Sequence, residues 1–230
     1  MKIGILETGV PPRDLQAQFG QYGAMFEHLL GERAFDWALY DVRAGTLPAR
    51  PEDCDGYLIT GAAAGVYDPL PWIGETERFL QNAKGKAALV GVCFGHQLMA
   101  QAFGGKVIKS PKGWGVGLHR YEVIHRRPWM DAATSFAAAA SHQDQVVEAP
   151  PATTVLAGSD FTPFGMLAWD DQPAISIQLH PEFEPAYAQA LIEARRGRYG
   201  EARADAAVAS LEGPDDRARL GRWIGAFLRR

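Results

Sequence analysis

The alternation of short apolar runs with amphipathic segments in the first hundred residues is the feature that most constrains the fold. Short runs typical of β-strands occupy residues 2–6, 35–42, 56–60 and 87–92. Apolar residues at helical spacing occupy 14–30, 72–83 and 94–103. The resulting order predicts an α/β fold with an open, mainly parallel sheet flanked by helices. The nearly continuous apolar character of the strands indicates a sheet covered on both faces.

Beyond residue 105 the pattern changes. Short strand-like runs separated by Pro, Gly and Asp follow, at 106–110, 117–124, 135–141, 145–150, 154–159, 165–170 and 174–180. They indicate antiparallel strands added to the parallel core. From residue 185 helices are predicted, with a break over 212–216. Because no repeat, low-complexity tract or linker interrupts the chain, we expect residues 1–230 to form one domain with a C-terminal helical extension over about 185–230.

Composition excludes several classes of protein. Apolar residues make up 47% and charged residues 22%, which is typical of a globular protein. A net charge of -4 argues against a nucleic-acid partner, and the Arg-rich stretches at 195–198 and 217–230 are interpreted as solvated helix faces. No apolar stretch is long enough to span a membrane. With no signal peptide at the N-terminus and only two cysteines, the sequence predicts a cytoplasmic protein.

Cys93 lies where a predicted strand turns into a helix, flanked by Gly91 and Gly95. This is the form of a nucleophile elbow, in which the glycines remove side chains that would clash in the tight turn. A helix N-terminus favours the thiolate, and the N–H group of Phe94 is placed to stabilise an oxyanion. The alternative, a buried structural cysteine, is common. Cys54 lies in a polar run without such flanks, and we expect it to be unreactive.

A thiol nucleophile needs a base and a group that orients the base. Of the six histidines, His28 and His125 are predicted to lie on the surface, and His96 to line the site from the elbow helix. His180 is the strongest candidate, because it ends the apolar run 174–179 at the ligand-binding edge of an α/β sheet. Glu182, two residues later, is placed to accept a hydrogen bond from the imidazole.

Two stretches, GVCFGHQLMAQAFGG (91–105) and ISIQLHPEF (175–183), resemble the signatures of class I, triad-type glutamine amidotransferases. The chain is most similar to the stand-alone variety related to the glutaminase domain of guanosine monophosphate synthetase. Residues 59–68 resemble the family's oxyanion loop and 140–150 its substrate loop. The likeness runs from residue 1 to about 185, and it implies a flavodoxin-like fold.

The resemblance implies a role for each matching residue. Cys93 would attack the amide carbon of glutamine or another γ-glutamyl compound to form a thioester, with His180 as base and Glu182 orienting it. Backbone N–H groups of Ala62 and Phe94 would hold the oxyanion. The substrate-binding residues that it implies are Gly61, Gln97, Ser141, His142, Gln143 and Asp144.

Two loops depart from the family pattern. The oxyanion loop, usually Ser-Gly-Gly-Pro, reads Thr60-Gly61-Ala62-Ala63, and the Ser-His-Gly-Asp loop carries Gln143 in place of glycine. Both changes affect substrate recognition and leave Cys93, His180 and Glu182 intact. Free glutamine is therefore a less secure substrate than the thioester chemistry.

Three functions remain open. The chain has no Gly-rich phosphate loop and no cluster with metal-ligand spacing, so no cofactor and no metal are expected. No synthetase segment is present, which leaves an amidotransferase subunit passing ammonia to a separate synthetase, or an independent γ-glutamyl hydrolase or peptidase. The third is a non-catalytic binding module, which would have no use for an intact triad. Neither nucleic acid nor membrane is expected as a partner.

Overall fold

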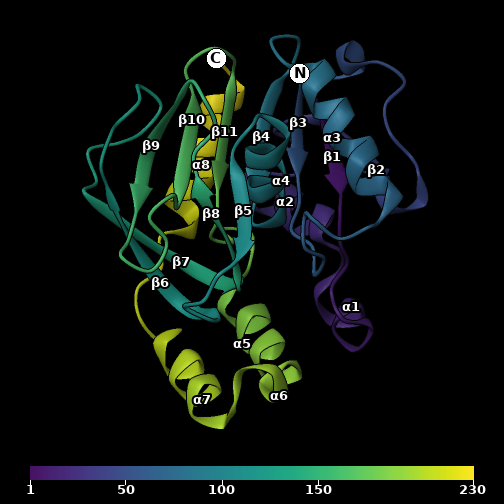
Figure 1. Cartoon of the computed structure of the whole chain (residues 1–230). Helices are drawn as coiled ribbons and strands as arrows, with labels where there is room; N and C mark the ends of the chain where they lie inside the picture. The colour runs from purple at the N-terminus through teal and green to yellow at the C-terminus, as the bar shows by residue number, and fades with distance from the viewer.

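The parallel half of the sheet is built from the N-terminal segments of the chain. The computed structural model describes residues 1–230. In spatial order the strands are β2 (Asp36–Asp41), β1 (Lys2–Glu7), β3 (Gly56–Ile59), β4 (Ala88–Val92) and β11 (Ala174–Ile177). All four pairings between them are parallel. Their carboxyl ends therefore meet at one edge of the sheet, as Figure 1 shows.

Four more strands extend the same sheet in antiparallel fashion. They are β10 (Met166–Trp169), β9 (Thr153–Gly158), β6 (Gly115–Val123) and β7 (Ser135–His142). A separate antiparallel pair joins β5 (Lys106–Lys109) to β8 (Asp144–Glu148). The predicted fold class is confirmed, with one correction: β11, grouped with the antiparallel additions, is parallel to β4. All four of its residues are buried, as expected of a strand at the centre of a covered sheet.

Helices cover both faces of the sheet. The helices α3 (Pro71–Ala83) and α4 (Phe94–Ala102) pack on one face, where Tyr57 and Ile59 belong to the same core as Phe79 and Leu98. On the other face lie α2 (Tyr22–Leu30) and α8 (Arg217–Leu228). The helix predicted over 14–30 is two helices, α1 (Arg13–Phe19) and α2, because Gly20 has a positive φ of 76° that an α-helix cannot include. Two short 3-10 turns, Val42–Ala44 and Pro51–Asp53, precede β3.

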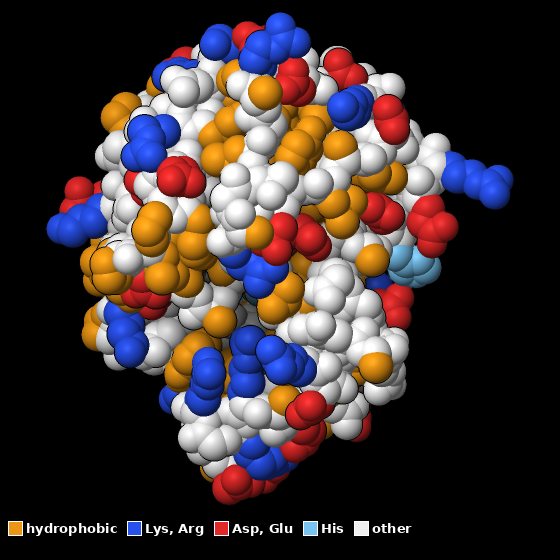
Figure 2. All heavy atoms as spheres, turned by 90° about the vertical axis from the view of Figure 1, so that its right-hand side faces the viewer, with side chains coloured by type: hydrophobic (Ala, Val, Ile, Leu, Met, Phe, Trp, Pro, Cys, Tyr) orange, Lys and Arg blue, Asp and Glu red, His pale blue; other side chains and the backbone are white.

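The C-terminal segment begins as a helical lobe and returns to the sheet. The helices α5 (Pro185–Ala194), α6 (Arg196–Tyr199) and α7 (Glu201–Ser210) lie together at the lower end of the molecule in Figure 1, beyond the carboxyl edge of the parallel strands. The predicted break over 212–216 separates α7 from α8. Figure 2 shows Lys and Arg side chains gathered around a hollow in the lower half of one face. None of these helices has the length and apolar character that crossing a membrane requires.

Candidate active site

Cys93 occupies the turn between β4 and α4 in strained backbone geometry. Its φ is 52° and its ψ is -103°, and Ala152 is the only other non-glycine residue with a positive φ. Gly91 and Gly95 are required because backbone atoms of neighbouring segments approach them too closely for a side chain. A Cβ at Gly91 would lie 2.5 Å from the carbonyl oxygen of Gly95, and one at Gly95 would lie 2.3 Å from that of Ile59. The backbone therefore has the geometry that the sequence predicts for a nucleophile elbow.

The strand pairing brings His180 to the cysteine. Val92 is opposite Ile177 in the parallel pair β4–β11, and the N–H of Cys93 donates to the carbonyl of Ile177 at 2.9 Å. The strand itself ends at Ile177, three residues before the position predicted. The N–H of His180 then donates to the carbonyl of Ala139 at 2.8 Å, which anchors the segment after β11 to β7.

Glu182 and Phe183 fix the imidazole of His180. The Nδ1 atom lies 2.7 Å from Oε1 of Glu182, and the two side chains are 5% and 0% exposed. The ring of Phe183 stacks on the imidazole, with 3.9 Å between centroids and 7° between planes. Because Nδ1 is held by the carboxylate, Nε2 is the nitrogen left to exchange a proton.

The charge state of His180 follows from its neighbours. Burial disfavours the charged imidazolium and lowers the pKa, but the negative charges of Cys93 and Glu182 and their hydrogen bonds outweigh burial and raise the pKa to about 10. A buried imidazolium at neutral pH requires such a counter-charge. The arrangement therefore suits a thiolate–imidazolium pair held in place by a carboxylate.

The loop at Gly61 and Ala62 lies against this pair. A Cβ at Gly61 would be 2.9 Å from Cε1 of His180 and 3.6 Å from Cβ of Cys93. The hydroxyl of Thr8 donates to the carbonyls of Thr60 at 2.8 Å and of Gly61 at 3.2 Å, and these hydrogen bonds hold the loop in place. The N–H of Ala62 donates to no group in the protein. Ala62 also keeps a negative φ, so its methyl group forces no backbone strain.

Phe94 supplies the second predicted oxyanion donor. It is the first residue of α4, so its N–H has no acceptor within the helix and is directed out of the helix end. Its side chain is buried against Trp72 and holds that end of the helix in the core. Both predicted donors therefore have an unused N–H group beside Cys93.

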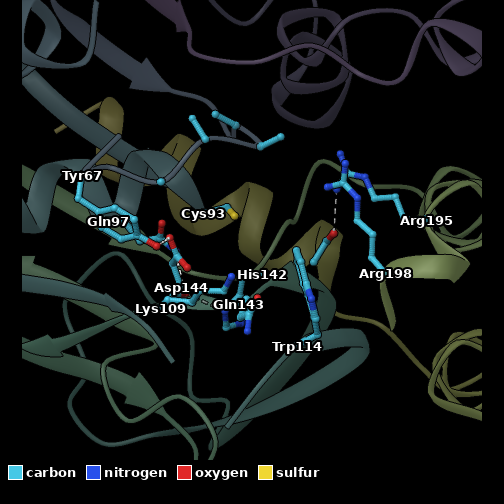
Figure 3. Close-up of a pocket in the computed structure, with 15 residues that line it drawn as sticks. Tyr67, Cys93, Gln97, Lys109, Trp114, His142, Gln143, Asp144, Arg195 and Arg198 are labelled. Carbon is cyan, nitrogen blue, oxygen red and sulfur yellow. Dashed lines mark hydrogen bonds between the residues drawn. The ribbon is translucent and has the colours of Figure 1, made fainter. Parts of the chain in front are cut away.

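A cavity of about 190 Å³ opens in front of Cys93 (Figure 3). Of the predicted site residues, seven line it: Ala62, Cys93, Gln97, Ser141, His142, Gln143 and Asp144. The remaining four, Gly61, Phe94, His180 and Glu182, lie outside the lining and are buried. His96, expected to line the site, is fully buried and bonds to Ser176 at 2.7 Å instead.

Asp144 is held at one end of this cavity. The hydroxyl of Tyr67 donates to its Oδ2 at 2.8 Å, and Nε2 of Gln97 donates to its backbone carbonyl at 2.8 Å and to Oε1 of Gln178 at 3.1 Å. Burial raises the pKa of Asp144, while Tyr67 and the charge of Lys109 lower it. The side-chain N–H groups of Gln97 are thus used in hydrogen bonds within the protein, so only its side-chain carbonyl oxygen is left for a substrate.

His142 does not act on the thiol in this arrangement. Its Nδ1 atom lies 3.1 Å from the carbonyl oxygen of Asp144, and burial, reinforced by the nearby His119, lowers its pKa to about 3. The ring is therefore neutral and braces the loop that carries Gln143. The side chain of Gln143 lines the cavity and forms no hydrogen bond within the protein.

Eight further residues line the cavity, of which Ala63, Ala64, Gly65 and Tyr67 belong to the predicted oxyanion loop, 59–68. The other four, which the sequence did not assign to the site, are Lys109, Trp114, Arg195 and Arg198. The interpretation of 195–198 as a solvated helix face is incomplete. Arg198 is exposed and Arg195 is half-buried, but α5 and α6 fold over the carboxyl edge of the sheet, so both side chains also line the cavity (Figure 3). No spacing in the sequence indicated this position, since these residues lie about a hundred positions beyond Cys93.

Comparison with known proteins identifies the family of this chain. The profile of the glutamine amidotransferase class-I family matches residues 18–195, and the chain belongs to that family. It is 29% identical to gamma-glutamyl peptidase 3 of Arabidopsis thaliana, over 72% of this chain and 70% of the relative. It is 32% identical to one subunit of the glutamine-hydrolysing GMP synthase of Methanopyrus kandleri, over 48% of this chain and 60% of the relative.

A solved structure supports the fold. A glutamine amidotransferase from Thermotoga maritima superposes with a TM-score of 0.81, covering 100% of this chain and 99% of that one at 16% sequence identity. At this identity the likeness concerns the fold alone. The predicted membership of the family and the flavodoxin-like fold are confirmed.

Proposed function

We propose that this chain is a cysteine-dependent hydrolase of γ-glutamyl amide bonds. The observation that carries the proposal is the strained backbone of Cys93 beside a His180 whose Nδ1 is 2.7 Å from Glu182, with a cavity in front of the thiol. A purely structural cysteine would need neither the strain nor the buried ion pair. Family membership supports the γ-glutamyl group as the part recognised.

In the first half of the reaction the thiolate of Cys93 attacks the γ-carbonyl carbon. The carbonyl oxygen becomes an oxyanion that accepts hydrogen bonds from the N–H groups of Ala62 and Phe94. The imidazolium of His180 then gives its Nε2 proton to the departing nitrogen, and the carbon–nitrogen bond breaks. A γ-glutamyl thioester and a free amine or ammonia result.

In the second half a water molecule attacks the thioester. His180, now neutral, takes a proton from this water at Nε2, the carbon–sulfur bond breaks, and glutamate leaves with the thiolate restored. Glu182 keeps the ring oriented and stabilises the imidazolium in both halves, as the carboxylate of a triad does. Asp144, at the end of the cavity held by Tyr67, provides a carboxylate for the substrate's α-ammonium group.

The experiment that tests this proposal combines turnover with labelling. Purified protein is offered glutamine and a panel of γ-glutamyl amides, and released glutamate is measured for wild type and for Cys93→Ser. We expect glutamate release only from wild type, and alkylation by a glutamine-like diazo-ketone at Cys93 but not at Cys54. Labelling at Cys54, or turnover by Cys93→Ser, would overturn the assignment of the nucleophile.

A second candidate function is ammonia supply to a separate synthetase. It is favoured by the similarity to one subunit of a glutamine-hydrolysing GMP synthase. An ammonia supplier of this kind would be nearly inactive by itself and would gain activity with its partner, whereas an independent hydrolase turns over unaided.

Both cysteines are free, in keeping with the reducing cytoplasm that we propose as the compartment.

A further inference from the structure

The charges that line the cavity differ from those of the whole chain. Three basic residues, Lys109, Arg195 and Arg198, line it together with one acidic residue, Asp144. The chain as a whole has 27 acidic residues and 23 basic ones. A positive cavity in an acidic protein indicates that part of its ligand is anionic.

The two arginines have no carboxylate partner within the protein. No ion pair involves Arg195 or Arg198, and the only side-chain hydrogen bond of either is from Nη1 of Arg195 to Oγ of Ser141, at a long 3.5 Å. Arg196, which lies between them in sequence, contacts three carboxylates. The carboxylates are those of Glu193, Glu201 and Asp205, at 2.8, 2.9 and 2.7 Å.

Packing holds the backbone at the two arginines in position. Arg195 caps α5, and its N–H donates to the carbonyls of Leu191 and Ile192. Tyr199 is buried and packs edge-on against Trp114, with 5.2 Å between ring centroids. The backbone of the short turn that carries Arg198 is thereby fixed to the wall of the cavity.

The two ends of the cavity have different chemistry. In Figure 3, Tyr67, Gln97 and Asp144 lie on one side of Cys93, and Arg195 and Arg198 lie on the other. A γ-glutamyl group whose α-ammonium meets Asp144 would place its amide carbon at the thiol. The leaving group then extends toward the arginines.

We propose that Arg195 and Arg198 bind a carboxylate on the leaving group. The substrate class is then γ-glutamyl amino acids or peptides with a free carboxylate, in preference to glutamine or uncharged γ-glutamyl amides. A guanidinium recognises a carboxylate through paired, charge-assisted hydrogen bonds. The inference rests on the proposed function, because it assigns a leaving group to that reaction. The carboxylate itself takes no part in bond breaking.

The test uses two substrates that differ only in this charge, γ-glutamylglycine and γ-glutamylglycinamide. Values of kcat/KM are measured for wild type, for Arg195→Gln, for Arg198→Gln and for the double variant. Arg196→Gln is the matched control, because it removes the same charge from a residue whose partners lie outside the cavity. We expect wild type to prefer γ-glutamylglycine by about tenfold or more, the effect of hydrogen bonds to a charged group.

The double variant should lose this preference, because its kcat/KM for γ-glutamylglycine falls by about tenfold more than its kcat/KM for the glycinamide. A cooperative thermal unfolding transition like that of wild type shows that the double variant folds. Arg196→Gln should keep the preference. Equal turnover of both substrates by wild type, or a preference that survives in the double variant, would overturn the inference and leave the proposed function standing.

A binding measurement separates this inference from the proposed function. Calorimetry of both compounds against Cys93→Ser reports recognition without turnover. If wild type cleaves neither compound but Cys93→Ser binds γ-glutamylglycine more tightly, the proposed hydrolysis is wrong and the carboxylate site stands. Equal affinity of Cys93→Ser for the two compounds overturns the carboxylate site.

Discussion

Replacing Gly95 with alanine should destabilise the protein and slow its reaction together. An added Cβ would lie 2.3 Å from the carbonyl oxygen of Ile59, and real Cβ atoms are essentially never found closer than 3.0 Å to such an atom. The neighbour is backbone in the buried strand β3, so no flexible side chain can yield. Helix α4 therefore has to move by about 0.7 Å relative to β3. That movement also lengthens the hydrogen bond from the N–H of Gly95 to the carbonyl of Thr60, which is 3.1 Å in the wild-type structure.

The magnitude follows from these contacts. Forcing one extra carbon into a packed core costs about 1–3 kcal/mol. For a chain of this size that cost lowers the Tm by roughly 2–12 °C. The N–H of Phe94 moves with the helix, and a misplacement of about 1 Å in a catalytic group can cost roughly 100-fold in rate. We expect kcat to fall by at least about tenfold.

The assay is thermal unfolding followed by circular dichroism, together with initial rates on the best substrate of the panel. Gly197→Ala is the matched control, because a Cβ at Gly197, in the exposed turn α6, meets nothing within 4 Å. It should leave Tm within a few degrees of wild type and leave kcat unchanged. A Gly95→Ala protein as stable and as fast as wild type would show that the close approach of α4 and β3 is not what requires the glycine.

Three further predictions concern the site. His180→Ala should abolish turnover, whereas Glu182→Gln should keep part of the activity, because the glutamine amide can still orient the imidazole although it lacks the negative charge. Steady-state rates measure both effects, and an active His180→Ala protein would exclude His180 as the base. In an NMR titration the imidazole of His180 should keep its proton up to about pH 10 and lose it above that pH. In Cys93→Ser the pKa of His180 should fall, because burial still disfavours the imidazolium while the thiolate charge is removed. An unchanged pKa in Cys93→Ser would contradict the ion pair. Replacing Ala62 and Gln143 together with glycine should raise the glutaminase rate, measured as ammonia release, since the family's usual residues return; a lower or unchanged rate would show that these departures do not limit the use of glutamine.

Much of the fold was predictable because its signals are local. Continuous apolar runs predicted the buried parallel strands, and the glycines around Cys93 predicted a sharp turn whose close contacts the structure contains. The direction of β11 was not predictable in this way. Its residues are buried and mostly apolar whichever way the strand runs, and only its place between β4 and β10 fixes the orientation. The break at Gly20 was missed because apolar spacing continues across it.

The residues of the site likewise differ in whether the sequence around them indicates their position. Cys93, His180 and Glu182 are each marked by the residues beside them, so a short stretch of sequence is enough to nominate them. Arg195 and Arg198 carry no such mark. A helix with several arginines is usually solvated on that side. The sequence cannot tell Arg196, whose carboxylate partners lie on the preceding helix α5 and the following helix α7, from neighbours that face the cavity. Only the folding of α5 and α6 over the sheet separates them.

This division bears on how members of one family come to differ in substrate. The residues proposed to break the amide bond act on atoms that every γ-glutamyl compound shares, so they constrain the leaving group very little. The leaving group is proposed to meet the side chains of Arg195 and Arg198 in the C-terminal helical segment, and the family profile ends at Arg195, three residues before Arg198. Changes in this short segment alter the charge at one end of the cavity without disturbing Cys93, which is held by β4, α4 and β11. A relative that keeps the triad but lacks basic residues on this turn should therefore favour an uncharged leaving group.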